Sequence, residues 1–196
     1  MICGVILAAG ASTRLGRPKQ LLELDGRPLL QHVLDAAARA RLDEILLVLG
    51  HRAEAVQAAV ELPAGARVVL NPEYRTGQSS SLRAGLAAAD RRCDAAVILL
   101  GDQPGLPAEL IAEAVQVHRR GGRPVLRTFF DGVPGHPVVV DRSEWPALAD
   151  LGGDAGGRQL WSSPGDVARL DVAGPPPADV DTWEQYEALR DGVELD

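Results

Sequence analysis

The sequence lacks several features that mark common classes of protein. No run reaches the roughly 18 apolar residues that span a bilayer, and no basic segment precedes an apolar stretch at the N-terminus. We therefore expect a cytoplasmic protein with no signal peptide and no membrane contact. Basic residues are also few, because 20 Lys and Arg face 27 Asp and Glu for a net charge of −7. This balance argues against a broad nucleic-acid-binding surface.

Cysteine is scarce as well. Cys3 lies in an apolar run and Cys93 just before another, and neither belongs to a C-x-x-C motif or a Cys/His cluster. This pattern favours two reduced, structural thiols over a disulfide or a zinc site. An acidic chain can still bind an anionic ligand, but it then needs local devices such as backbone amides, helix N-termini or a bound metal ion.

Apolar runs alternate with helical patterns along most of the 196 residues. The runs predict strands at 3–8, 44–49, 67–70 and 95–100, and the patterns predict helices at 28–40, 53–60, 81–89 and 107–119. Unbroken apolar runs are typical of parallel strands that helices cover on both faces. The alternation therefore predicts an α/β fold, a single Rossmann-like domain over residues 1–196 with a mostly parallel, twisted sheet.

The alternation changes after residue 120. Residues 125–130 and 133–140 flank Asp131-Gly132, a dipeptide that favours a two-residue hairpin turn. This signal predicts an antiparallel hairpin strand within the sheet. A short strand at 167–172 and a last helix at 182–190 complete the expected elements.

The loop after the first strand carries the strongest functional signal. Its small residues let the backbone approach a ligand closely, and glycines such as Gly10 and Gly16 can supply the unusual dihedrals of a phosphate nest. Arg14 and Lys19 add positive charge there. The loop is not a P-loop, because five residues separate Gly10 from Gly16, and Ser12 breaks the dinucleotide-binding fingerprint. The alternative is an ordinary connection between a strand and a helix.

Two aspartates are candidate metal ligands. Asp102 follows the fourth strand, and carboxyl ends of central parallel strands face the ligand crevice of such sheets. Its alternative role is that of a turn residue before Pro104. Asp181 precedes the last helix, where Thr182 and Gln185 already match a capping box and leave this carboxylate free. Two such oxygen ligands would suit Mg²⁺, with positions left for phosphate oxygens and water.

Residues 71–80 lead into the third predicted helix and contain several turn-forming side chains. Three consecutive serines, Ser79, Ser80 and Ser81, stand where this helix is expected to begin. Serine is a preferred N-cap residue, so we expect one of them to cap the helix. By itself, the segment is consistent with an ordinary capped loop.

Together these motifs resemble the MobA-like nucleotidyltransferase family, and within it the branch of molybdenum-cofactor cytidylyltransferases. The resemblance rests on L-A-A-G-x-S-x-R-L-G-x-x-K at 7–19, G-D-Q-P at 101–104, G-H-P at 135–137, G-D-x-G-x-R at 153–158 and D-x-D-T at 179–182. It extends from residue 3 to about residue 186, with Leu15 where methionine is usual. The resemblance implies the fold of the nucleotide-diphospho-sugar transferases and an enzyme that depends on Mg²⁺.

The resemblance also assigns residues to roles. It implies catalytic roles for Arg14, Lys19 and Asp102 and a metal site formed by Asp102 and Asp181. The nucleotide-binding residues that it implies are Leu7, Ala8, Ala9, Gly10, Arg14, Lys19, Gly77, Ser81 and Asp102. The acceptor-binding residues that it implies are Gln103, Pro104, Gly135, His136, Asp154 and Arg158.

The implied reaction joins CMP from CTP to the phosphate of molybdopterin and releases pyrophosphate. CTP is favoured over GTP because the loop contains Ala8-Ala9-Gly10 in place of the Ala-Gly-Gly of the guanylyltransferase branch. The implied partners are CTP, the phosphorylated acceptor and, transiently, a molybdoenzyme or its chaperone. Three alternatives stay open: the same transfer with another base or acceptor, an oxidoreductase, and a non-catalytic protein that binds the cofactor.

Overall fold

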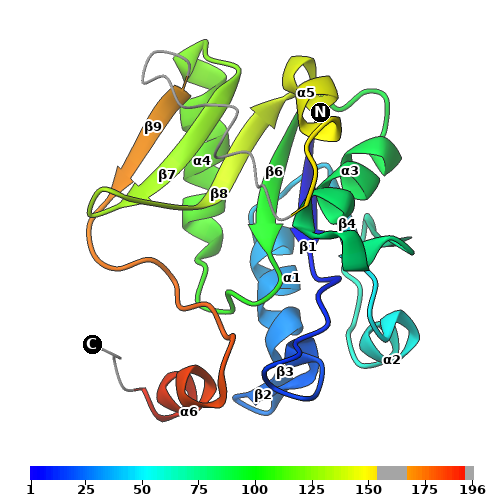
Figure 1. The fold of residues 1–196 in the computed structure, drawn as a ribbon. Helices are drawn as coiled ribbons and strands as arrows, with labels where there is room; N and C mark the ends of the chain where they lie inside the picture. The colour runs from blue at the N-terminus through cyan, green and yellow to red at the C-terminus, as the bar shows by residue number, and fades with distance from the viewer. Residues whose placement is uncertain (154–166, 193–196) are drawn as a thin grey trace.

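The computed structural model describes residues 1–153 and 167–192, and a seven-stranded sheet lies at its centre (Figure 1). The strands follow one another in space in the order β5-β4-β1-β6-β8-β7-β9. Their bounds are β1 Ile2–Leu7, β4 Glu44–Leu49, β5 Ala66–Leu70, β6 Ala95–Leu100, β7 Val125–Phe130, β8 Val133–Asp141 and β9 Val167–Val172. β8 runs antiparallel to both of its neighbours, and the other neighbouring pairs are parallel.

Helices cover the sheet on both faces, as the unbroken apolar runs predict. Side chains of α1 (Leu29–Arg39), α2 (Ala53–Ala58) and α4 (Ala108–Gly121) pack in one hydrophobic cluster. Those of α3 (Gln78–Ala88) and α5 (Trp145–Ala149) pack in another. Alternate residues of β4 enter the two clusters, with Ile45 and Leu47 on one face and Leu46 on the other. The α/β class and the mostly parallel sheet are therefore confirmed.

The hairpin between β7 and β8 has the turn that its sequence predicts. Asp131 and Gly132 both have positive φ angles, of 46° and 85°, which is the pattern of a type I′ turn. β8 returns from this turn and inserts between β6 and β7. The predicted antiparallel hairpin strand is therefore confirmed.

Both cysteines are buried free thiols, as expected. Cys3 lies on β1, and Cys93 lies just before β6, the strand beside it. Burial raises the pKa of both thiols, so they stay protonated at neutral pH. Within residues 1–153 and 167–192, no helix combines the length and the hydropathy that crossing a membrane requires.

Helix α3 begins earlier than the sequence predicts. It starts at Gln78, and its N-cap is Gly77, which has a φ of 112° and provides no side-chain cap. The prediction that one of the serines caps this helix is therefore wrong. The serines lie in the first turn, where Ser79 Oγ donates a hydrogen bond to Gly153 O over 2.7 Å. A glycine can make the sharp entry turn, so the helix starts without a polar cap.

Several short elements carry no clear sequence signal. They are the hairpin of β2 (Glu23–Leu24) and β3 (Arg27–Pro28), the short helix α5, and the 3₁₀ turns η1 (Lys19–Leu21), η2 (Tyr74–Thr76) and η3 (Arg142–Glu144). Each is too short to show a hydrophobic period. Pro28 directly precedes α1 as its N-cap residue, although the sequence predicted that Pro28 lies in the first turn of this helix.

The last helix, α6 (Trp183–Asp191), lies near the β2–β3 hairpin and packs against residues 15–29 (Figure 1). A small apolar cluster joins these two segments and consists of Leu15, Leu22, Leu29, Val180 and Tyr186. The Tyr186 hydroxyl donates a hydrogen bond to the Glu23 carbonyl over 2.6 Å. The predicted capping box of Thr182 and Gln185 is present. The segment before α6 is thereby held beside the loop after β1.

The contact of α3 with the sheet leads to a prediction about stability. A Cβ at Gly85 would lie 2.5 Å from Val5 Cγ1 and 3.0 Å from Val48 Cγ2. Because β-branched side chains in strands are stiff, we expect Gly85→Ala to lower the free energy of unfolding by about 1–3 kcal/mol. Denaturant unfolding of the variant and the wild type measures this difference.

Gly121→Ala is the matched control, because Gly121 is also helical and a Cβ there would lie 3.5 Å from Ala168 Cβ, an ordinary contact. We expect this change to be neutral or to stabilise the protein by up to about 1 kcal/mol. Equal effects of the two substitutions would contradict the close packing of α3.

Candidate active site

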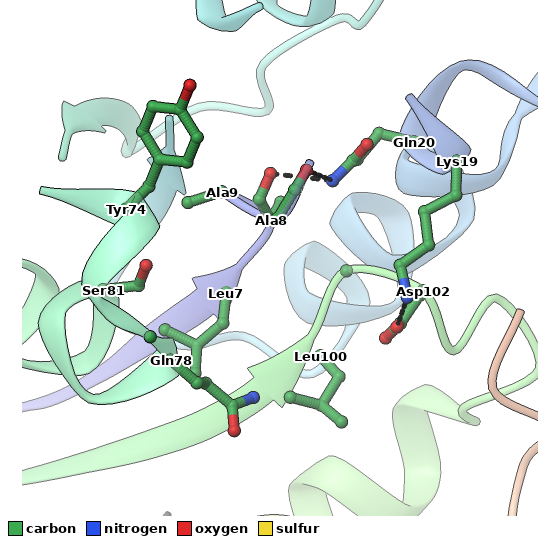
Figure 2. A pocket seen from close by; sticks show the side chains of 13 residues that line it. Leu7, Ala8, Ala9, Lys19, Gln20, Tyr74, Gln78, Ser81, Leu100 and Asp102 are labelled. Carbon is green, nitrogen blue, oxygen red and sulfur yellow. Dashed lines mark hydrogen bonds and ion pairs between the residues drawn. The ribbon is translucent and has the colours of Figure 1, made fainter. Parts of the chain in front are cut away.

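A cavity of about 240 Å³ opens at the carboxyl ends of β1 and β6. Its lining joins the loop after β1, the start of α3 and the end of β6: Leu7, Ala8, Ala9, Gly10, Lys19, Gln20, Tyr74, Gly77, Gln78, Ser81, Leu100, Gly101 and Asp102. Figure 2 shows Lys19 and Asp102 pointing toward each other on one side, with Tyr74 and Ser81 on the opposite side. The cavity therefore brings together most of the nucleotide-binding residues that the sequence predicts.

Close packing of backbone forms the floor of the cavity. A Cβ at Gly101 would lie 2.8 Å from Ala8 Cβ, so the two strand ends could not be as close with a larger residue there. The Gly101 amide donates to the Leu7 carbonyl over 2.9 Å, and the Ala8 amide donates to the Val48 carbonyl over 3.0 Å. These bonds fix the backbone against which a ligand would lie.

Gln20 is a buried residue of the site that the sequence analysis missed. Its amide nitrogen donates to the carbonyl of Ala8 over 2.9 Å and to that of Gly10 over 3.5 Å. Its side-chain oxygen is buried without a hydrogen-bond partner among the described residues. The available signal was a polar residue between Lys19 and a leucine pair. Gln20 holds the loop carbonyls in place beside the cavity.

The loop between Gly10 and Lys19 is shaped by two left-handed residues. Ser12 has a φ of 51° and Gly16 a φ of 69°, whereas Gly10 is not among the residues with positive φ. The unusual dihedrals that a glycine can supply in this loop are therefore found at Gly16, and Ser12 adds a second left-handed residue. A Cβ at Gly10 would meet nothing within 4 Å, so its lack of a side chain leaves space open above the loop.

One ammonium group joins the two predicted metal ligands. Lys19 Nζ donates to an Asp102 carboxylate oxygen and, over 2.7 Å, to Asp181 Oδ1. Arg14 Nη1 lies 3.9 Å from Asp181 Oδ2. The side chains of Lys19 and Asp102 are only 13% and 17% exposed, whereas that of Asp181 is 49% exposed. Asp102 and Asp181 are therefore close in space, as their proposed common role requires.

The ion pairs shift two pKa values in opposite directions. Burial disfavours the charged ammonium of Lys19, but the adjacent Asp102 and Asp181 more than compensate, and the pKa of Lys19 is raised. The hydrogen bond from Lys19 lowers the pKa of Asp181. At neutral pH the cluster therefore contains a charged lysine and an ionised Asp181.

The segment that carries Asp181 is attached to the end of β6. The Val180 amide donates to the Asp102 carbonyl over 3.3 Å. Burial and the nearby Asp102 raise the pKa of Asp179, and the side chain of the buried Gln103 acts in the opposite direction. Gln103 therefore lies beside the C-terminal segment.

Polar side chains organise the wall that α3 contributes. The Asn71 side-chain amide donates to the hydroxyl oxygens of Ser80 and Ser81 over 2.9 and 3.0 Å. A Cβ at Gly50 would lie 2.5 Å from Tyr74 Cβ, so Gly50 allows this ring to pack at the edge of the cavity. Asn71 and Tyr74 were not predicted as site residues, although both lie in the segment 71–80 that leads into α3.

The predicted acceptor residues are not all brought to the cavity. Gln103 and Pro104 directly follow Asp102. Gly135 and His136 lie on β8, outside the set of residues that lines the cavity. A Cβ at Gly135 would lie 2.8 Å from the Phe130 ring, which explains a glycine there by packing. Asp154 and Arg158 lie outside the described residues.

Comparison with known proteins identifies the family. Residues 4–168 match the family model of the MobA-like NTP transferase domain. The chain belongs to the MobA-like NTP transferase family. It is accordingly a nucleotidyltransferase with a nucleoside triphosphate as substrate, and the resemblance found in its motifs is confirmed.

Two relatives match this transferase over nearly its whole length, one of them in two crystal structures. Nicotine blue oxidoreductase of Paenarthrobacter nicotinovorans is 37% identical over 203 residues, which cover 96% of each chain. The crystal structure of Rv0371c from Mycobacterium tuberculosis has a TM-score of 0.88 at 38% identity and covers 97% of each chain. A structure of Rv0371c in complex with manganese has a TM-score of 0.83 at 36% identity, with 98% and 99% covered.

The donor chemistry of this transferase fits a divalent cation between Asp102 and Asp181. Within the described ranges, no group of three or more His, Cys, Asp or Glu side chains could hold a metal ion. The pair of aspartates nevertheless holds a cation already, the Lys19 ammonium, between oxygens from two distant segments. Two hard oxygen ligands leave further coordination positions for a phosphate-bearing substrate.

The lowered pKa of Asp181 leads to a pH-dependent prediction. Because the ionised form is favoured in the folded state, its contribution to stability is present above the ordinary aspartate pKa of about 4 and is lost as the pH falls through the lower folded value. We expect wild type to melt at a higher temperature than Asp181→Asn at pH 7, and the difference to shrink on acidification below pH ~4. Melting curves followed by circular dichroism from pH 7 to pH 3 measure it. A difference that stays constant over this range would contradict the ion pair.

Proposed function

We propose that this transferase joins CMP from CTP to the phosphate of the molybdenum cofactor and releases pyrophosphate, in a reaction that depends on Mg²⁺. The observation that carries the proposal is the Lys19 ammonium between Asp102 and Asp181, at one side of a cavity with a backbone floor. This arrangement offers positive charge and a cation site where the phosphates of a nucleotide would lie beside the loop after β1.

The proposed chemistry needs no general base from the protein. A phosphate monoester has a second pKa of about 6, so the attacking acceptor is already largely a dianion at neutral pH. Catalysis then depends on positioning and charge neutralisation. A divalent cation held by Asp102 and Asp181 would supply part of that neutralisation. The compact ammonium of Lys19 suits charge that redistributes during transfer, and the fork of Arg14 suits binding of phosphate oxygens.

A relative crystallised with manganese supports a divalent cation in this family, and Mg²⁺ is our proposal for this chain.

The contacts of the two basic side chains suggest different roles for them. Arg14 reaches only the outer, exposed aspartate, Asp181, whereas Lys19 reaches both carboxylates. We therefore assign nucleotide binding mainly to Arg14, and transition-state stabilisation mainly to Lys19.

The preference for CTP rests on Ala8-Ala9-Gly10 and on the wall opposite the charged cluster. Gly77 and Ser81 line the cavity there, and Ser81 Oγ accepts a hydrogen bond from Asn71. An oxygen fixed in this way can read one polar edge of a base. A base with the wrong edge would leave it unpaired, at a cost of about 1–3 kcal/mol.

The remaining assignments complete the proposal. We assign acceptor binding to Gln103, Pro104, Gly135 and His136, with molybdopterin as the acceptor; Asp154 and Arg158, which the motif resemblance adds, lie outside the described residues. The protein would act in the cytoplasm as a single domain over residues 1–196 and pass its product to a molybdoenzyme or to the chaperone of such an enzyme.

A second candidate activity comes from the relative named nicotine blue oxidoreductase, which is 37% identical over nearly the whole chain. An oxidoreductase would need a redox cofactor. The loop after β1 lacks the glycine pattern of dinucleotide-binding folds, because Ser12 replaces the second glycine. This difference favours the transferase activity. Measuring NADH and NADPH oxidation in the presence of nicotine blue tests the alternative directly.

The proposed function predicts a specific substrate pair. Purified protein with Mg²⁺, molybdenum-loaded molybdopterin and each of the four NTPs should release pyrophosphate fastest with CTP. Discrimination against GTP by about 1–3 kcal/mol corresponds to roughly 5- to 150-fold in kcat/KM. A coupled phosphate assay measures the rates, and omitting the acceptor is the control. Equal rates with CTP and GTP would refute the base assignment, and no release with any NTP would refute the reaction.

The metal assignment predicts unequal effects of two conservative substitutions. Asp102→Asn should lower turnover by about 100-fold, because a neutral amide cannot balance the charge of the cation. Asp181→Asn should lower it less, because Asp181 is 49% exposed and solvent screens its charge more than that of Asp102. Steady-state kinetics with CTP measure both effects.

The control for these two variants is Asp94→Asn. Asp94 lies at the opposite, amino end of β6 and is 85% exposed, so turnover should stay within about twofold of wild type. Activity of Asp102→Asn within a factor of about three of wild type would show that Asp102 has no metal role.

A further inference from the structure

Lys19 is the only lysine of the sequence, in which the other 19 basic residues apart from histidine are arginines. Its ammonium contacts both carboxylates that would bind the cation. Building on the proposed function, we propose that Lys19 is a resident counter-ion of the metal site. It competes with the divalent cation for Asp102 and Asp181, until the phosphates of a bound nucleotide draw the ammonium away.

The two carboxylates belong to a backbone that is held in place. The Asp102 carbonyl accepts a hydrogen bond from Val180, and the Asp181 amide donates to Gln185 Oε1 over 2.8 Å. Val180 itself is fully buried in the apolar cluster under α6. The oxygens that hold the cation are therefore anchored on both sides.

The ammonium is the part of the cluster that can move. The Lys19 backbone is fixed, because its amide donates to Ser12 Oγ over 3.0 Å and it opens the 3₁₀ turn η1. Between this backbone and Nζ lies a four-carbon stem with several rotatable bonds. Lys19 also lines the nucleotide cavity, so a rotation of the stem can carry Nζ from the carboxylates to a phosphate in that cavity.

Charge repulsion prevents the Lys19 ammonium and a divalent cation from binding the two carboxylates at the same time. Asp102 and Asp181 together carry two negative charges, and Nζ already donates to an oxygen of each. A divalent cation at the same oxygens would stand within a few ångströms of the ammonium, a strongly repulsive arrangement. The negative charge of a triphosphate removes this conflict, because it offers the ammonium a new partner. The metal and the nucleotide should therefore bind together.

The choice of residue supports an exchangeable contact. Arginine presents a rigid fork that binds a carboxylate through two parallel hydrogen bonds, whereas lysine is a point charge on a flexible stem. This chain uses arginine at every other strongly basic position. A lysine at this one position gives a counter-ion that leaves the carboxylates easily.

The first experiment measures the affinity for Mn²⁺ without nucleotide, by the electron paramagnetic resonance signal of the free ion. Lys19→Met removes the competing charge and keeps the length of the side chain, so it should bind Mn²⁺ at least about tenfold more tightly than wild type. The charge-matched control is Arg17→Met, which removes a cation of the same loop that lies over the Trp183 ring. That variant should change the affinity by less than about threefold.

The results separate this inference from the proposed function. Unchanged or weaker Mn²⁺ binding by Lys19→Met would overturn the competition, and so would an equal gain in Arg17→Met. In either case, pyrophosphate release by the wild type would leave the proposed function standing. If Asp102→Asn binds Mn²⁺ as tightly as wild type does, the metal site itself is wrong, and the metal role in the proposed function fails with it.

The second experiment uses the unmutated protein and does not depend on the folding of a variant. Because the chain has one lysine, lysine labelled with ¹³C and ¹⁵N gives the NMR signals of a single side chain. Adding Mg²⁺ alone at millimolar concentration should leave most of the signal in the ion-paired position, whereas adding Mg²⁺ with a non-hydrolysable CTP analogue should shift it. A signal that Mg²⁺ alone shifts completely at micromolar concentration would overturn the proposal, as would a signal that neither addition shifts.

Discussion

The charged cluster of the site depends on an apolar contact between residues 15–29 and the C-terminal segment that carries Val180 and α6. Lys19 and Asp181 are 162 positions apart and meet because α6 packs on the loop after β1. The cluster of Leu15, Val180 and their neighbours excludes water beneath this contact, and burial of a few large apolar side chains contributes several kcal/mol. Without that contact, Asp102 would face the cavity alone, and the Lys19 ammonium would lack its second carboxylate partner.

The floor of the cavity shows a different use of packing. Gly101 and Ala8 allow two strand ends to approach within a distance that larger side chains would prevent. Backbone hydrogen bonds and the buried Gln20 then fix the carbonyls of that floor. A rigid backbone surface next to one mobile lysine is a suitable arrangement for phosphoryl chemistry, in which positioning and charge do most of the work.

The sequence predicted the sheet well because its strands are buried on both faces, which leaves unbroken apolar runs such as residues 44–49 and 95–100. Through the motif resemblance it paired Asp102 with Asp181 as metal ligands, whereas the position of the Lys19 ammonium between the two carboxylates depends on packing that no motif states. Gln20 was missed because a polar residue in a loop normally faces solvent. The start of α3 was misplaced because the serine signal for a cap was strong, whereas a glycine entry turn leaves no comparable signal.

The long separation of Lys19 and Asp181 has a consequence for biosynthesis. A chain that leaves the ribosome presents β1, the loop and then β6 well before the segment around Asp181 is made. During that interval Lys19 lacks Asp181, one of the two carboxylates that its ammonium contacts in the folded chain. Translation order therefore makes the contact of Lys19 with Asp181 one of the last tertiary contacts that the chain can form, so that it coincides with the completion of the fold.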